Sequence, residues 1–214
     1  MATSIKNGTF EESGHVYRDE QGIEIPSTTQ ILEGLGLIDL DNIPGATLEH
    51  KRQLGDAVHY ATRYMDQDTL DWSTVQQEWA GYLVAYTNFC EEMQFVPEPE
   101  WIEKSGVHQI NGMKYGYTID RIGRIGTLAH RFLFEIKTAY KLESSWKLQT
   151  AAYELAVPKS NGEYIARAAL QLKPDGSYKL HLFEDPRDKD AWTWCLAVTH
   201  WKIKEKLKWK KDKL

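Results

Sequence analysis

The chain has 214 residues, of which 42% are hydrophobic and 27% charged. This length predicts one domain, and the composition excludes intrinsic disorder over most of the chain. No run of about 18 apolar residues occurs, so the sequence predicts no membrane-spanning helix. Two cysteines, Cys90 and Cys195, are too few for a four-cysteine zinc or iron–sulfur site and indicate no disulfide framework.

The net charge of −5 hides an asymmetry between the end of the chain and the rest. The last fourteen residues carry seven lysines against Glu205 and Asp212, which gives +5, so the other residues sum to −10. With Trp201 and Trp209 between the lysines, this segment has the composition of one that contacts phosphates. It is equally typical of a solvated helix end, where lysine suits the helix dipole. Both interpretations stay open.

The first half of the chain predicts a polar start followed by helices. The start lacks the apolar stretch of a secretory signal and is too acidic for a transit peptide, so we expect a flexible segment over 1–14 and a cytoplasmic protein. Two short strands around Gly22 and a short helix capped at Ser27 follow. Apolar spacing then predicts helices over about 47–65 and 73–93, the second with Ser73 and Gln76 as a capping box.

After Pro97 and Pro99 the apolar period changes to two, which indicates strands. We expect three antiparallel strands, a helix, a hairpin and a last long helix, over 101–109, 113–125, 127–139, 144–157, 163–184 and from 185 onward. This order predicts one α/β domain over 15–200, with a central mixed β-sheet flanked by helices. Residues 201–214 are expected to form the basic end of the last helix.

Asp120, Glu135 and Lys137 are the residues with the most informative placement. Glu135 and Lys137 are two apart in a predicted strand, so they project from the same face, beside Asp120 on the neighbouring strand. The side chain of Ile136 points into the core, but its backbone carbonyl can turn toward the same site. Two carboxylates and a carbonyl are ligands that suit Mg²⁺ or Mn²⁺. The alternative is an ordinary strand with alternating surface charges.

Two further pairs lie one helical turn apart. Gln149 and Tyr153 stack on one face of the predicted helix, with Trp146 a turn earlier. Such a ridge suits a substrate-facing helix, or else is a half-exposed helix edge. Gly55 and His59 share the same spacing, and the imidazole would favour Mn²⁺ if it binds metal. Otherwise His59 is a partly buried histidine with a hydrogen-bond partner.

Taken in order, these elements resemble the PD-(D/E)XK nuclease superfamily. The motifs are GxxxH, a glycine–aspartate element, ExK and QxxxY, carried here by Gly55 to His59, Gly116 to Asp120, Glu135 to Lys137 and Gln149 to Tyr153. The glycine of the second motif stands one residue earlier than in the family pattern. The likeness spans about residues 26–200. It is to the RecB-like branch, and within it to the phage and mitochondrial exonucleases that lack an iron–sulfur cluster. It implies a restriction-endonuclease-like core.

The resemblance also implies roles for individual residues. Asp120, Glu135 and the Ile136 carbonyl would hold Mg²⁺ or Mn²⁺, His59 would be an additional ligand, and Lys137 the catalytic lysine. A metal-bound water would attack the phosphodiester, with Lys137 orienting it or stabilising the transition state. Gln149 and Tyr153 would hold the lysine or the DNA strand. Glu103 would be a supporting or a catalytic residue, and Thr138 a phosphate contact.

The function that follows is a metal-dependent, sequence-nonspecific DNA exonuclease acting on single- or double-stranded ends. The resemblance implies a role in phage DNA replication or recombination, in the host cytoplasm and with a possible partner protein. The expected DNA contacts are Arg52, Arg63, Arg121, Arg124, Thr138, Lys141, Trp146 and Tyr153, the last two by stacking. The alternatives are a catalytically inactive nuclease-fold module that binds DNA or a partner protein, and a structure-specific endonuclease.

Overall fold

The computed structural model describes residues 2–38 and 44–211, with side chains described as far as Lys206. It is a mixed α/β structure, as the sequence predicts. The helices are α1 Thr28–Gly34, α2 Gly45–Asp66, α3 Gln77–Met93, α4 Ser145–Ala156 and α5 Arg187–Lys211, with 3-10 turns η1 Glu12–Gly14, η2 Trp72–Thr74 and η3 Pro99–Trp101. The strands are β1 Ala2–Ile5, β2 Gly8–Glu11, β3 Val16–Asp19, β4 Glu24–Ile25, β5 Phe95–Pro97, β6 Lys104–Ile110, β7 Met113–Ile119, β8 Arg121–Ile125, β9 Arg131–Lys137, β10 Ile165–Leu172 and β11 Tyr178–Leu182.

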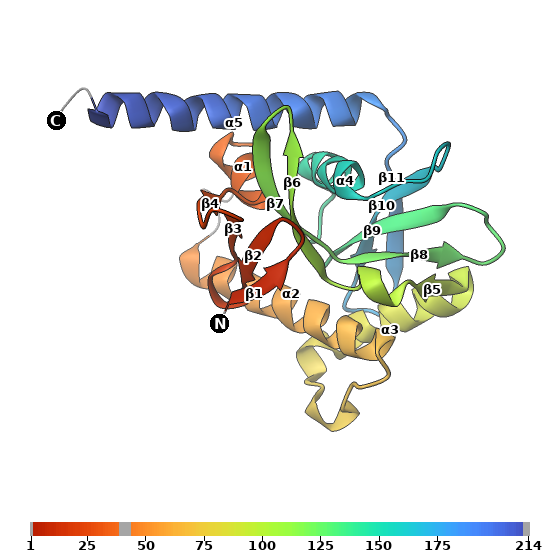
Figure 1. Cartoon of the computed structure of the whole chain (residues 1–214). Helices are drawn as coiled ribbons and strands as arrows, with labels where there is room; N and C mark the ends of the chain where they lie inside the picture. Colours follow the sequence, from red (N-terminus) through yellow and green to blue (C-terminus); the bar gives the residue numbers. More distant parts are fainter. Residues whose placement is uncertain (1, 39–43, 212–214) are drawn as a thin grey trace.

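The central sheet has five strands in the order β11-β10-β9-β8-β5. β9 and β10 are parallel because α4 carries the chain from one to the other, while the other neighbours are antiparallel. The expected central mixed sheet is therefore confirmed. Figure 1 shows α4 and α5 on one side of this sheet and α2 and α3 on the other.

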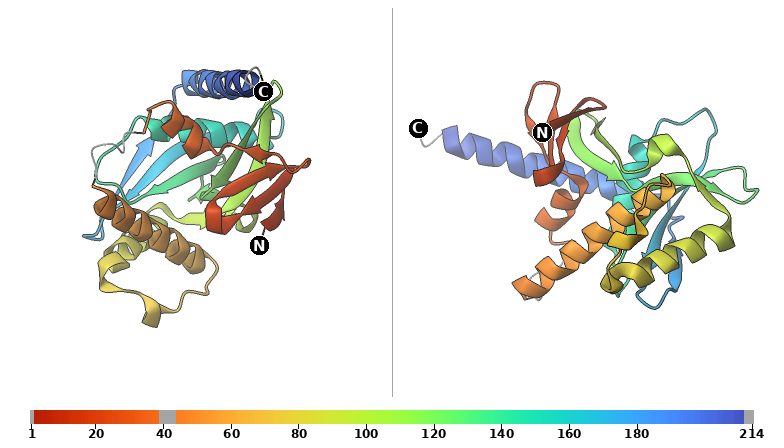
Figure 2. Two further views of the ribbon diagram at one scale, coloured as in Figure 1. Left: turned by 90° about the vertical axis from the view of Figure 1, so that its left-hand side faces the viewer. Right: turned by 90° about the horizontal axis from the view of Figure 1, so that it is seen from below.

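Side chains of β9 alternate between the two faces of the sheet. Leu133 belongs to the core shared with α1, α4 and α5, whereas Phe134 and Ile136 belong to the core shared with α2 and α3. Because alternate residues share a face, Glu135 and Lys137 lie on the α4 side with Leu133. The side chain of Ile136 points into the opposite core, as expected. Figure 2 shows the same layers from two other directions.

The strand predicted over 113–125 is divided at Asp120. β7 pairs with β6 in a separate two-stranded sheet, whereas β8 pairs with β9 and β5 in the central sheet. The chain therefore passes from one sheet to another at a single residue. An alternating pattern that continues through such a junction predicts one strand, because both halves are half-buried.

The N-terminal segment, which we expected to be flexible over 1–14, forms the strands β1 and β2 in the structure. β1 and β2 extend the antiparallel sheet begun by β3 and β4. Ile5 and Phe10 pack against a small core that contains Tyr17 and Val107, so this polar segment contributes enough apolar side chains to hold its place. Residue 1 lies outside the described residues.

Tyr17 also explains the glycine that departs from the family spacing. A Cβ on Gly116 would lie 2.2 Å from the ring of Tyr17, so only glycine fits where this ring packs against β7. The position of this glycine is thus fixed by packing against the N-terminal sheet.

The helix boundaries agree with the sequence at α1 and differ at α3. Ser27 and Gln30 form the capping box of α1. α3 begins at Gln77 and not at Ser73, because Asp71 Oδ1 accepts from Ser73 N at 2.9 Å and caps a separate 3-10 turn. Among the helices of the described ranges, none has a stretch long and apolar enough to cross a bilayer.

Candidate metal centre

Asp120 lies where β8 leaves β7, at the open end of the pairing between β8 and β9. The ladder between β8 and β9 ends at the pair of Arg121 and Phe134, so the next backbone N–H on this side of β9, that of Ile136, has no strand beside it there. Asp120 Oδ2 accepts this N–H at 2.6 Å. The carboxylate is 5% exposed and is fixed against the β9 backbone, which carries Glu135 and Lys137.

His59, Glu103 and Asp120 form a group in which one ligand atom of each lies within 4.8 Å of the others. His59, on α2, has Nδ1 3.5 Å from Asp120 Oδ1 and 3.6 Å from Glu103 Oε1. Glu103 comes from the bend between η3 and β6. Three segments far apart in the sequence therefore bring one imidazole and two carboxylates to one point, an arrangement that suits a divalent cation.

Glu135 adds a carboxylate oxygen that has no hydrogen-bond partner among the described residues. Its Oε1 accepts from Lys137 Nζ at 2.8 Å and from Gln149 Nε2 at 2.7 Å. Its Oε2 is buried without a hydrogen bond. Leaving a buried polar atom unsatisfied costs about 1–3 kcal/mol, and more for a charged group. The carboxylate of Glu135 is close enough to influence the charges of Asp120 and His59, so it would also attract a cation at the neighbouring group, and the residues present fit a metal ion.

Lys137 is held in place by the first turns of α4. Its Nζ donates to Gln149 Oε1 at 3.0 Å and lies 5.9 Å from the centre of the Trp146 ring. Gln149 Nε2 in turn donates to Tyr153 Oη at 2.9 Å. The structure thus brings together the ExK and QxxxY residues, and Gln149 contacts both the lysine and the glutamate.

The charges of the group are strongly coupled. Burial, and then the nearby carboxylate of Glu135, raise the pKa of Asp120 to about 8. Burial lowers the pKa of His59, but the carboxylates of Asp120 and Glu103 more than offset this and raise it to about 9. Burial raises the pKa of Glu103, but His59 and Arg121 outweigh it, so the net shift is downward. Carboxylates crowded in this way favour a nearby positive charge.

Three residues expected to contact DNA are buried, which corrects those expectations. Arg121 is fully buried and pairs with Asp66 and Glu103. Trp146 and Tyr153 are 2% and 4% exposed, because α4 turns them toward the sheet. These two rings have no free face on which a base could stack.

The other expected contacts have different surroundings. Arg52 and Lys141 are exposed, Arg52 with ion pairs to Glu49 and Asp56 on the same helix. Arg63 is half-buried, with its Nε unpaired. Thr138 is half-buried, and its Oγ1 lies 3.6 Å from the place of a Cβ on Gly55, so α2 passes directly beside it.

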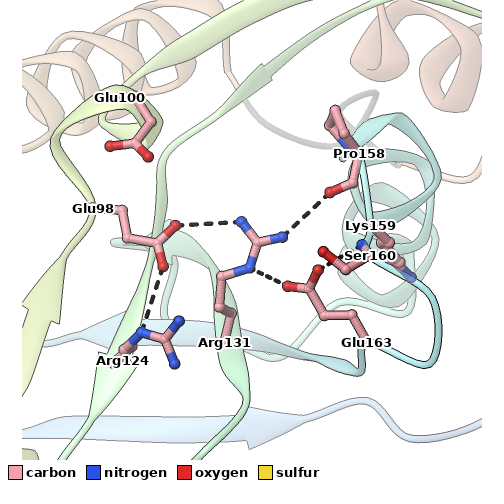
Figure 3. A pocket seen from close by; sticks show the side chains of 8 residues that line it. All are labelled: Glu98, Glu100, Arg124, Arg131, Pro158, Lys159, Ser160 and Glu163. Carbon is pink, nitrogen blue, oxygen red and sulfur yellow. Dashed lines mark hydrogen bonds and ion pairs between the residues drawn. The ribbon is translucent and has the colours of Figure 1, made fainter.

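Arg124 lines a separate polar pocket, shown in Figure 3. Its Nε lies 3.8 Å from Glu98, which also pairs with Arg131 at 3.3 Å. Arg131 is further paired with Glu163 at 2.6 Å. The charges of this pocket neutralise one another, and none of its lining residues belongs to the metal-binding group.

The sequence did not predict that Glu103 belongs to the metal-binding group itself. It also did not predict that Asp66 pairs with the buried Arg121. Glu103 lies in a bend and Asp66 at the end of a helix, so neither falls in a periodic pattern that marks a site. The indication for Glu103 in the sequence came from the resemblance to the nuclease superfamily.

Comparison with known proteins gives no family for this chain, so its function is inferred from its own residues. No family model matches the chain. A search of curated proteins likewise gives no match.

Proposed function

We propose that this chain is a divalent-metal-dependent deoxyribonuclease that hydrolyses phosphodiester bonds at DNA ends without reading sequence. The observation that supports it best is the group of His59, Glu103 and Asp120 next to Glu135, whose buried Oε2 has no partner. Lys137 lies beside that carboxylate. The order of these residues, together with the mixed sheet, supports the proposal of a restriction-endonuclease-like core of the RecB-like branch.

The proposed metal ligands are His59, Asp120, Glu135 and the backbone carbonyl of Ile136, with Glu103 within reach. The oxygen ligands suit Mg²⁺ or Mn²⁺, and the imidazole favours Mn²⁺. When bound, such an ion lowers the pKa of a water ligand and neutralises charge on the phosphate.

Lys137 has the geometry of a group that stabilises developing charge. Glu135 and Gln149 each accept a hydrogen bond from its Nζ, so the ammonium is fixed before substrate arrives. A fixed ammonium next to a reacting phosphate needs little reorganisation during the reaction. Gln149 positions the lysine, and Tyr153 supports Gln149 from the core side.

Binding to DNA would rest on phosphate contacts. The expected contacts that remain accessible are the exposed Arg52, Arg124 and Lys141 and the half-buried Arg63 and Thr138. Arginine, lysine and threonine side chains are common phosphate contacts, which is consistent with the proposed sequence-independent binding. A role in phage replication or recombination, in the host cytoplasm and with a partner protein, remains an expectation from the family resemblance.

The test is cleavage of end-labelled linear DNA with Mn²⁺ or Mg²⁺, with and without a chelator. We expect cleavage that the chelator abolishes, and a loss of about 10²- to 10⁴-fold in Lys137→Ala. Lys179→Ala removes an exposed lysine from the edge strand β11 and should cleave like the wild type. A closed circular substrate separates an exonuclease from an endonuclease. Binding without cleavage under any metal would instead assign a DNA-binding module.

A further inference from the structure

We propose that Arg121 is a positioning residue of the metal centre, which holds Glu103 and the backbone of Asp120 where the metal binds. The inference rests on the proposed metal centre. It gives a role to the buried guanidinium of Arg121, which takes no part in the proposed reaction.

The guanidinium of Arg121 joins four groups at once. Its Nη1 donates to Glu103 Oε1 at 2.9 Å and to the backbone oxygen of Asp120 at 2.5 Å. Its Nε donates to Asp66, and its Nη2 to Thr62 Oγ1 at 3.3 Å. Two members of the metal-binding group are therefore tied to α2 by one planar side chain with fixed donor directions.

Glu103 needs such a tie because its own backbone is unusual. Its φ of 50° lies in the left-handed region, which is uncommon for residues other than glycine. It stands between η3 and β6, with its N–H donating to the Asp120 oxygen at 2.9 Å. The loop and Arg121 thus meet at the same backbone oxygen, and Arg121 also holds Glu103 Oε1, the oxygen that faces His59 Nδ1.

Asp66 anchors the arginine in the core. Its two oxygens accept from Tyr86 Oη, both at 2.9 Å, and Tyr86 lies in the core between α3 and the sheet. Asp66 therefore contacts Tyr86 in the core and Arg121 beside the metal-binding group. Shortening Arg121 would break the link from this anchor to Glu103.

Charge gives a second reason for an arginine at this place. Asp66, Glu103, Asp120 and Glu135 are four carboxyl groups in one buried region, faced by Arg121, Lys137 and His59. Without Arg121, Asp66 and Glu103 would lose their shared cation. A lysine would keep the positive charge but could not make all of these hydrogen bonds at once. Arg121→Lys therefore tests the positioning of Glu103 and Asp120 while the charge is kept.

Arg167 provides a matched control. It is 4% exposed, on β10, and pairs with Glu154 at 3.2 Å and Asp188 at 3.1 Å, so it is as buried and as ion-paired as Arg121. It contacts none of the metal-binding residues. Arg167→Lys therefore reports the effect of removing a buried guanidinium as such.

The experiment measures the dissociation constant for Mn²⁺ from the electron paramagnetic resonance signal of the free ion, with urea unfolding of each variant alongside. We expect wild type to bind, Arg121→Lys to bind about 10- to 100-fold more weakly, and Arg167→Lys to bind like wild type at a similar loss of stability. In a Glu103→Ala background, Arg121→Lys should weaken binding less than it does in wild type, because the two residues act together.

Asp66→Asn, which touches no metal ligand, is the second variant if Arg121→Lys does not fold, and should also weaken Mn²⁺ binding. Wild-type affinity in Arg121→Lys, or in Asp66→Asn where that replaces it, overturns the inference while leaving the metal centre intact. Equal weakening in Arg167→Lys overturns it too. If wild type itself binds no Mn²⁺, the proposed function fails and the inference with it.

Discussion

Asp120 Oδ2 accepts the backbone N–H of Ile136 at 2.6 Å, so a side chain takes the position that a neighbouring strand would otherwise fill. The same carboxyl group has its other oxygen 3.5 Å from His59 Nδ1. Asp120 therefore closes the ladder between β8 and β9 and faces the candidate metal centre at once. Substitutions here affect both stability and chemistry.

Replacing Asp120 by alanine and by asparagine should separate these two effects. Alanine leaves the buried N–H of Ile136 without an acceptor, which we expect to lower the free energy of unfolding by about 1–3 kcal/mol. Asparagine keeps an acceptor oxygen and should retain wild-type stability, while both variants lose cleavage. Urea unfolding and the end-labelled cleavage assay measure the two. Equal destabilisation by both variants would show that the hydrogen bond is not the cause.

Trp146→Phe should leave the dissociation constant for DNA unchanged and lower the unfolding free energy. The indole is buried on the side of α4 that faces the sheet. A smaller ring there loses packing, which should lower the free energy of unfolding by about 1–3 kcal/mol. Fluorescence anisotropy with labelled DNA and urea unfolding provide the two readouts. A weaker DNA complex at unchanged stability would mean that the ring is reached by substrate.

Lys141→Ala should reduce the salt dependence of DNA binding. Each phosphate contact contributes about 0.9 to the slope of log affinity against log salt, so the loss of one exposed lysine should lower the slope by nearly one. Titrations at several salt concentrations measure this, with Lys179→Ala as the control that keeps the wild-type slope. A wild-type affinity independent of salt would contradict binding through phosphates altogether.

Asp19→Asn should make stability less dependent on pH in acid. The ion pair with Lys114 at 2.8 Å, together with backbone hydrogen bonds from Gln21 and Ile23, lowers the pKa of Asp19 below its usual value near 4. A lowered folded-state pKa stabilises the protein above the unfolded pKa, and this stabilisation is lost as the pH falls through the folded one.

Urea unfolding of wild type and Asp19→Asn between pH 7 and pH 3 tests this directly. Wild type should be the more stable at pH 7, and the two should converge in acid. A difference in stability that stays constant over this range would show that the ionisation of Asp19 is not its cause.

The sequence predicted the regular elements well because their patterns are local. The helices α1, α2 and α4, the hairpin of β10 and β11, and the helix cap at Ser27 follow from spacing within about ten residues, whereas the capping box predicted at Ser73 and Gln76 was wrong. The junction at Asp120 was missed because a change of sheet leaves the alternation of apolar residues intact. The strands β1 and β2 were missed because their few apolar residues become buried only against β3 and β6.

The site was predictable where it follows one strand and one helix. Spacing placed Glu135 with Lys137 and Gln149 with Tyr153, and the contact between the two pairs is the one that the family resemblance implies, made over the short connection from β9 to α4. Arg121 was misplaced because sequence alone does not show which arginines face inward. Its partner Asp66 lies 55 residues earlier in the chain, and a contact of that separation has no local pattern.

The N-terminal sheet bears on how shortened forms of this chain would behave. Tyr17 Oη hydrogen-bonds to Thr118 Oγ1 at 2.6 Å, and Thr118 is only two positions from Asp120. Deleting the first fourteen residues would remove β1 and β2, uncover the ring of Tyr17 and loosen β7 just before the candidate ligand. Loss of activity after such trimming would then reflect a displaced carboxylate and not the absence of a catalytic group.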